Sequence, residues 1–189
     1  MVRRMSAGPT TSAKGGLRFV QNLGLRFALV YAAIAATLFA IYAFPFELFG
    51  AQHDWLNGYL AGYAHLAGAV LRVFDGSVVV DGTFIHGRYP LQIVRNCDAA
   101  EVNILFVSAM LAFPGALSRK AIPLLSGVAV LVGANVTRIC SLYYVGVFAP
   151  NWFRTAHEEI WPLLLVICAV VVFLVCVRYL SSPAQGGPA

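Results

Sequence analysis

Charged side chains are scarce in this chain. Only 11% of its 189 residues are Asp, Glu, Lys or Arg, and 60% are hydrophobic, whereas a soluble domain carries about 25% charged and about 45–50% apolar residues. The composition therefore argues against a water-soluble fold and predicts an integral membrane protein. The short length and the lack of a solenoid-like repeat predict one compact helical domain.

Patterns that bind metals are also missing. Three of the four histidines, His53, His65 and His86, lack the i, i+4 spacing that places two imidazoles on one face of a helix. We therefore expect neither a metal centre nor a cofactor.

The net charge of +5 is explained by topology rather than by nucleic-acid binding. The first apolar run is preceded by several basic residues, as the positive-inside rule requires of a cytoplasmic segment. These residues are Arg3, Arg4, Lys14, Arg18 and Arg26.

Long apolar runs are abundant. Residues 27–46 can span about 30 Å of hydrocarbon, so we interpret them as a retained membrane helix rather than a secretory signal. Residues 102–117, 122–148 and 160–177 are predicted to be further spans. Residues 1–25 form an expected flexible basic cytoplasmic tail, residues 26–180 a single membrane-embedded domain, and residues 181–189 a disordered C-terminal tail.

Two segments between the first and second of these runs differ from the rest. Residues 56–74 contain Asn57, His65 and Arg72 among Gly and Ala, which is typical of a helix lying in the membrane interface rather than crossing it. After it, Asp81-Gly82 separates two short runs of β-formers, so a β-hairpin is predicted. The expected fold is an all-α polytopic membrane protein with four to five membrane helices and a short extracytoplasmic β-hairpin.

The orientation depends on whether residues 56–74 cross the bilayer. If they do not, the hairpin, Cys97 and His157 lie outside, while the basic residues after the second run face the cytoplasm. If they do, all of these sites exchange sides. We prefer the first arrangement because the short basic stretch 118–120 between two strong spans resembles a cytoplasmic loop.

In both arrangements three polar residues come together. Cys97 precedes the span that begins at residue 102. Arg138 follows the start of the returning helix by about 16 residues, a rise of ~24 Å at ~1.5 Å per residue. His157 lies just before the last span. Since consecutive helices reverse direction, all three are predicted to meet at one surface of the bilayer, where polar residues in a lipid-embedded chain mark function.

The chemistry of the three residues suits acyl transfer to a thiol. A free cysteine has a pKa of about 8.5, so a nucleophilic thiolate needs a neighbouring imidazole or cation. His157 would move protons between the thiol, the leaving amine and the incoming nucleophile. Arg138 would stabilise the thiolate and the oxyanion by charged hydrogen bonds.

Each residue also has a simpler interpretation. Cys97 could be a packing residue like Cys140, Cys168 and Cys176, although its position where the hairpin meets a helix N-terminus favours a thiolate. Arg138 could anchor the helix at the interface.

The neighbours of these residues bear on the choice. Asn135, one turn before Arg138, favours an inward polar site. His157 alone would be an ordinary loop histidine. Glu101, one turn after Cys97, either orients His157, pairs with Arg138 or interacts with the helix dipole.

The three motifs that contain these residues, in this order, resemble those of the exosortase/archaeosortase family, most of all its exosortase H subgroup. The likeness covers residues 56–180, and family members often continue after the cysteine with a small residue and Gly, where this chain has Asp98-Ala99. The motifs that carry it are Asn96-Cys97-Asp98, Asn135-Val136-Thr137-Arg138-Ile139 and Ala156-His157-Glu158-Glu159-Ile160-Trp161.

The resemblance implies a cysteine transpeptidase or protease of the bacterial inner membrane, with its site facing the periplasm. Its substrates would be exported proteins whose C-terminus carries a short motif, a membrane helix and a basic tail. Cys97 would form a thioester that an acceptor, an amine or water, resolves. The alternative is a non-catalytic scaffold or assembly subunit whose polar residues hold helices together. A transporter is less consistent, because Cys97 and His157 lie near the surface.

Overall fold

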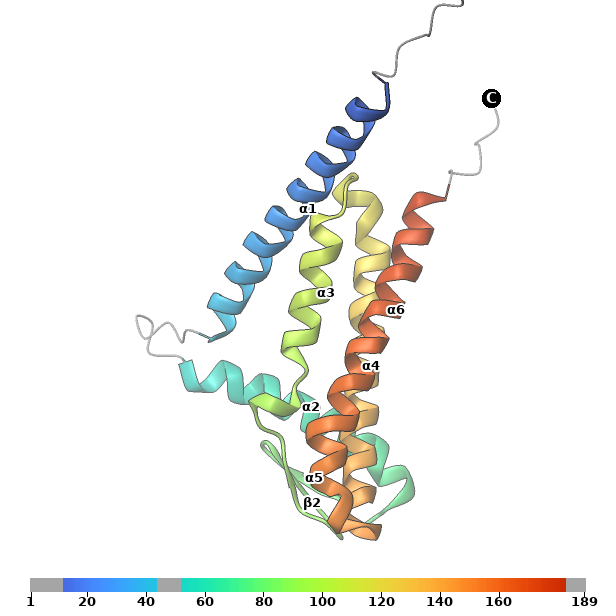
Figure 1. Ribbon diagram of the computed structural model, residues 1–189. Helices are drawn as coiled ribbons and strands as arrows, with labels where there is room; N and C mark the ends of the chain where they lie inside the picture. The colour runs from blue at the N-terminus through green and yellow to red at the C-terminus, as the bar shows by residue number, and fades with distance from the viewer. Residues whose placement is uncertain (1–11, 44–51, 183–189) are drawn as a thin grey trace, which may run out of the picture.

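A computed structural model describes residues 12–43 and 52–182, with side chains from residue 24 to 42 and, Asn96 excepted, from residue 57 onward. Three stretches are helical, long and apolar enough to cross a membrane: Gly24–Tyr42, Leu117–Phe148 and Pro150–Ser181. The chain is thus a mostly helical, multi-pass membrane protein. The long helices α4 (Leu117–Phe148) and α6 (Trp161–Ser181) run side by side along the bundle (Figure 1).

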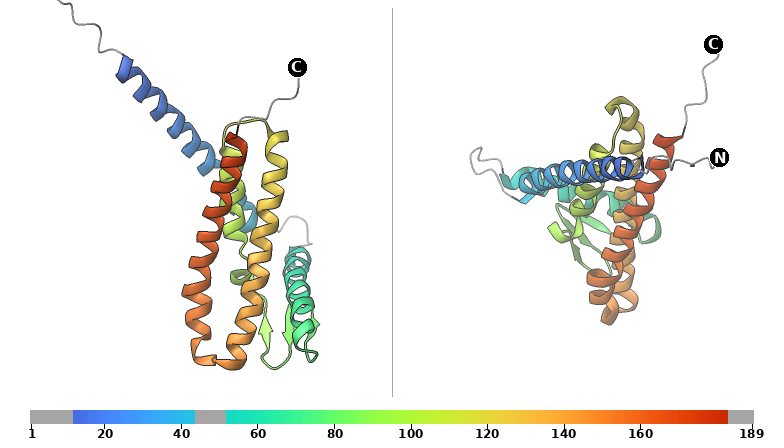
Figure 2. Two further views of the ribbon diagram at one scale, coloured as in Figure 1. Left: turned by 90° about the vertical axis from the view of Figure 1, so that its right-hand side faces the viewer. Right: turned by 45° about the horizontal axis from the view of Figure 1, so that its top comes forward.

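Helix α1 (Ser12–Ala43) begins inside the segment predicted as the N-terminal tail. The predicted end of its span, at residue 46, lies outside the described residues, as does most of the predicted C-terminal tail. The helix packs against α3 (Ala100–Ala112), while its N-terminal end diverges from the other helices (Figure 2).

Helix α3 is shorter than the span predicted at residues 102–117. Its 13 residues rise about 20 Å, less than the ~30 Å of a hydrocarbon core. Pro114 and Gly115, whose φ is 132°, end it. The buried ammonium of Lys120 then donates to the carbonyl oxygens of Leu111, at 3.1 Å, and Phe113. The helix is therefore shorter than predicted, and a full span at residues 102–117 is not confirmed.

The turn between these helices also differs from expectation. Residues 118–120, predicted as the loop, form the first turn of α4, and residues 113–116 make the connection. Lys120 accordingly caps α3 from inside the structure instead of facing water.

Helix α2 (Gln52–Phe74) is not among the candidate spans of the described chain. It runs across the end of the bundle where α4 ends, inclined to the long helices (Figures 1 and 2). Its buried apolar residues recur at the spacing of one helical face: Leu60, Ala64, Ala67 and Leu71. This placement supports the interfacial interpretation.

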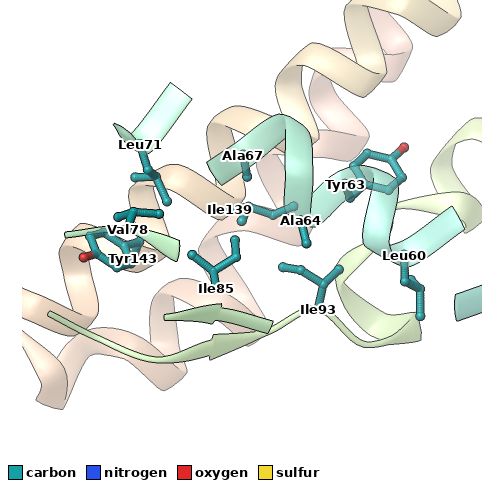
Figure 3. Close-up of a cluster of buried hydrophobic side chains, with 10 residues drawn as sticks. All are labelled: Leu60, Tyr63, Ala64, Ala67, Leu71, Val78, Ile85, Ile93, Ile139 and Tyr143. Carbon is teal, nitrogen blue, oxygen red and sulfur yellow. The ribbon is translucent and has the colours of Figure 1, made fainter. Parts of the chain in front are cut away.

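A small antiparallel sheet follows α2, in the order β1 (Val79–Asp81), β2 (Phe84–His86) and β3 (Leu91–Gln92). The predicted hairpin is β1–β2, whose turn uses Gly82 at φ 54°. The third strand was not predicted. One face of the sheet packs on α2 and α4 in a hydrophobic cluster (Figure 3) that includes Ile85, Ile93, Ala64, Ala67, Ile139 and Tyr143.

A polar network fastens this layer to α4. The carboxylate of Asp75 accepts hydrogen bonds from the Ser77 hydroxyl at 2.6 Å and from the Tyr143 hydroxyl at 2.9 Å, and it pairs with Arg88 at 3.4 Å. Hydrogen bonds from Ser77 are the main reason that the pKa of Asp75 is lowered. The sheet is therefore held rigidly against the helix that carries Arg138.

Candidate active site

Cys97 ends the short 3-10 turn η2 (Arg95–Cys97), which begins three residues after the end of β3. Its backbone N–H donates to the carbonyl of Val94 at 2.7 Å. Its own carbonyl accepts from the side-chain amide of Asn135 at 2.9 Å, and Asn135 is fully buried on α4. Asn135, a predicted supporting residue, thus fixes the backbone that carries the thiol.

Arg138 lies one turn after Asn135 on the same helix and is 4% exposed. It stands about 30 Å along α4 from Leu117, at ~1.5 Å per residue, which is close to the hydrocarbon thickness of a bilayer. This position brings Arg138 to the level of Cys97. Its burial is inconsistent with an arginine that merely extends to the membrane surface.

His157 lies in a helical segment and not in the loop expected before the last span. After α4, the chain forms η3 (Pro150–Trp152) and α5 (Phe153–Thr155), then the π-helical turn η4 (Ala156–Ile160), which continues into α6. π-helical turns are frequent at functional sites. The ring of Phe153 stacks on the imidazole with centroids 5.9 Å apart, which helps to orient it.

The three predicted residues are brought together in space. The Cys97 Sγ lies 4.0 Å from His157 Nε2, and Arg138 Nη2 lies 3.3 Å from His157 Nδ1. Because a guanidinium only donates hydrogen bonds, Nδ1 must be the acceptor. The proton of a neutral imidazole is then on Nε2, facing the sulfur.

A cavity of about 260 Å³ opens beside these three side chains. Residues 89–94 form one wall, and Ile139, Leu142 and Phe153 form the other. The walls are mostly apolar, with Cys97, Arg138 and His157 as its reactive groups. Such a cavity suits a short peptide segment presented to a nucleophile.

Comparison with protein families identifies the group to which the fold belongs. The family model described as Transmembrane exosortase (Exosortase_EpsH) matches residues 19–175. The chain belongs to the transmembrane exosortase family. No curated protein and no solved structure matches it. Exosortases are membrane-embedded and act on exported proteins that carry C-terminal sorting signals, and the matched range includes Cys97, Arg138 and His157.

Asp98, which follows Cys97 in the chain, makes contacts that the sequence did not indicate. It is 1% exposed, accepts from the Tyr42 hydroxyl at 2.8 Å and from the Ala100 N–H at 2.9 Å. Burial raises the pKa of this carboxyl. The guanidinium of Arg95 lies over the Tyr42 ring, 4.9 Å from its centroid. The end of α1 is therefore linked to the turn that carries Cys97.

The backbone after Asp98 takes an unusual conformation. Ala99 has φ 52° and ψ 25°, in the left-handed region that glycine adopts without strain. The turn that carries Cys97 therefore contains a left-handed residue that is not glycine.

Glu101 is the predicted supporting residue that the structure does not bring to the cavity. Its side chain is exposed in the first turn of α3, and no ion pair of Glu101 occurs within the described part of the chain. This placement agrees with an interaction with the helix dipole. Between residues 24 and 182, the described side chains include no cluster of three metal-ligating groups.

Proposed function

We propose that this exosortase is a cysteine transpeptidase or protease that cleaves C-terminal sorting signals of exported proteins through a thioester and transfers them to an acceptor. The single observation that carries the proposal is the chain of contacts from Cys97 Sγ through His157 to Arg138. A packing role for the three residues requires no such alignment.

In the first half of the reaction, Cys97, His157 and Arg138 form the thioester. The proton of the Cys97 thiol first passes to His157. The thiolate, balanced by this imidazolium and by the positive charge of Arg138, then attacks the scissile carbonyl carbon and forms a C–S bond. The guanidinium stabilises the resulting oxyanion. As the C–N bond breaks, the imidazolium of His157 gives its Nε2 proton to the departing amine and becomes a neutral imidazole. The products are a thioester on Cys97 and the released C-terminal tail.

The second half reverses the proton movement. An amine or water attacks the thioester carbonyl, and His157 takes its proton through Nε2. The C–S bond breaks and the thiolate leaves. The same three residues thus serve both steps, and the chemical nature of the acceptor decides between transfer and hydrolysis.

The proposed location is the bacterial inner membrane, with the site facing the periplasm. Arg138 stands about one hydrocarbon thickness from the basic end of α4, and α2 lies across the opposite end of the bundle. A substrate anchored by its own membrane helix would present its scissile bond at this level, so that encounter is largely confined to the plane of the membrane.

Replacement of the nucleophile tests the proposal. In the native host, Cys97→Ala should insert normally but leave exported proteins with uncut C-terminal tails, as measured by mass spectrometry of membrane fractions. Cys140→Ala is the matched control, because that thiol packs against the hydrophobic cluster and donates to the Ala67 carbonyl at 3.7 Å. A Cys97→Ala strain with the same C-termini as the wild type would refute the assignment and favour a scaffold.

A further inference from the structure

Strand β3 has one open edge. The sheet order places β2 on one side of it only. Ile93 donates to Thr83 of the neighbouring strand segment at 2.9 Å. In an antiparallel ladder, successive residues point their backbone groups to opposite sides. The N–H and C=O of Gln92 therefore point away from β2.

This open edge borders the cavity of the candidate active site. Every residue from 89 to 94 lines the cavity, and a surface that touches consecutive residues of an extended strand meets its edge rather than one of its faces. Ile93 confirms this, since its side chain is buried in the cluster under the sheet. Cys97 and His157 line the same cavity.

We infer that Gln92 pairs with the main chain of the substrate, which enters the cavity as an added β-strand. The inference rests on the function proposed above. One substrate residue would accept a hydrogen bond from the Gln92 N–H and donate its own N–H to the Gln92 carbonyl. The ligand is an extended peptide segment next to the scissile bond.

The neighbouring residues define how far this pairing extends. Pro90 has no N–H, so it offers only its carbonyl two residues before Gln92 along the same edge. Beyond Gln92, Val94 uses its carbonyl to accept from Cys97. The edge therefore offers a short pairing site five residues before Cys97 in the chain. Because the same short segment carries both the pairing site and the thiol, a paired peptide is held in a fixed position relative to the thiol.

The arrangement separates binding from selection. Main-chain hydrogen bonds hold any extended peptide, whereas the apolar wall of Leu142 and Phe153 selects its side chains. Tyr89 stacks against Phe153 with centroids 5.4 Å apart and joins the strand to that wall. The substrate segment should accordingly be extended and apolar.

Two variants of Gln92 test the pairing. The probe is the exported protein that accumulates uncut in the Cys97→Ala strain. Gln92→Pro removes the outward N–H without touching the ladder to β2, and should slow cleavage about tenfold, as expected for a lost backbone hydrogen bond. Gln92→Ala keeps the backbone N–H and should cleave about tenfold faster than Gln92→Pro. Cleavage at the wild-type rate by Gln92→Pro would overturn the inference.

A proline scan of the substrate tests the same strand pairing without altering the enzyme. Proline is placed in turn at each of four residues around the scissile bond. Loss of cleavage is expected at positions two residues apart, because only alternate residues point their N–H toward Gln92 and Pro90. Tolerance at every position, or loss at adjacent positions alone, contradicts strand pairing. This scan decides the matter if Gln92→Pro is missing from the membrane.

The two proposals fail in different ways. If no protein accumulates uncut in the Cys97→Ala strain, the proposed enzymatic function is wrong, and the pairing falls with it. If uncut protein accumulates there but Gln92→Pro and the proline-substituted substrates are processed normally, only the strand pairing is wrong.

Discussion

Ala99 holds a backbone conformation that costs an alanine roughly 1–3 kcal/mol. Its neighbours maintain it: the Asp98 carboxylate accepts from the Ala100 N–H at 2.9 Å, and Asn103 donates through its side-chain amide to the Ala99 carbonyl at 3.1 Å. The left-handed residue turns the chain from η2 into α3, so this strain belongs to the turn that presents Cys97.

A glycine at this position should relieve the strain. We expect Ala99→Gly to raise the free energy of unfolding by about 1 kcal/mol, after the greater flexibility of glycine in the unfolded chain is subtracted. Thermal unfolding in detergent measures this. Ala109→Gly, in the interior of α3, is the control and should lose about 1 kcal/mol. Equal losses in both variants would show that Ala99 is not strained.

At the residue scale, the sequence predicted which polar side chains come together but not the backbone conformation of the turn between them. The convergence of Cys97, Arg138 and His157 followed from the rise of a helix and the reversal of connected spans. Asn135 followed from its spacing to Arg138. The alanine itself gave no signal of the left-handed conformation of residue 99, because alanine rarely adopts that region. The contacts of Asp98 depend on a distant helix.

At the scale of elements, the lengths of α3 and β3 could not be derived from hydrophobicity. The apolar run continues past Ala112, while the helix ends there because Pro114 and Gly115 follow and Lys120 caps it. Strand β3 has two residues, too few to show alternation. The hairpin was predictable because Asp81-Gly82 is a strong local turn signal.

Two glycines of α4 allow a matched test of the packing between this helix and the cavity wall. A Cβ at Gly146 would come within 2.3–2.5 Å of the Tyr89 ring, whereas a Cβ at Gly133 meets nothing within 4 Å. Gly133→Ala should stabilise the helix by up to about 1 kcal/mol and leave cleavage unchanged. Gly146→Ala must displace Tyr89, and should lower cleavage several-fold.

The readout is cleavage of the same uncut protein, together with thermal stability in detergent. Similar behaviour of the two variants would mean that the position of Tyr89 does not matter for cleavage. Loss of cleavage in Gly133→Ala but not in Gly146→Ala would contradict the observed packing of α4, in which only a Cβ at Gly146 meets Tyr89.

At the scale of the whole molecule, the sequence left two membrane orientations, which place the candidate site on opposite sides of the bilayer. In a chain whose Cys140, Cys168 and Cys176 are replaced by Ala, an impermeant maleimide should label Cys97 from the periplasm. It should label Ser118→Cys, at the opposite end of α4, only after the inner membrane is permeabilised. The reverse pattern would place the site in the cytoplasm.

Contacts between segments far apart in the chain also could not be predicted from the sequence. The hydroxyl of Tyr42 meets Asp98 across 56 residues, and no periodicity or motif indicated this pair. Pairwise contacts of this kind depend on the tilt of α1 against α3, which is settled only when the complete fold is formed.

That same contact links the enzyme to its lipid surroundings. Tyr42 ends the apolar span of α1, and a membrane helix adjusts its inclination to the thickness of the bilayer around it. Because the Tyr42 hydroxyl binds the carboxyl of Asp98, the residue after Cys97, we expect a thinner or thicker bilayer to shift the turn that carries Cys97 through α1. We therefore expect the rate of the proposed cleavage to depend on the acyl-chain length of the surrounding lipids.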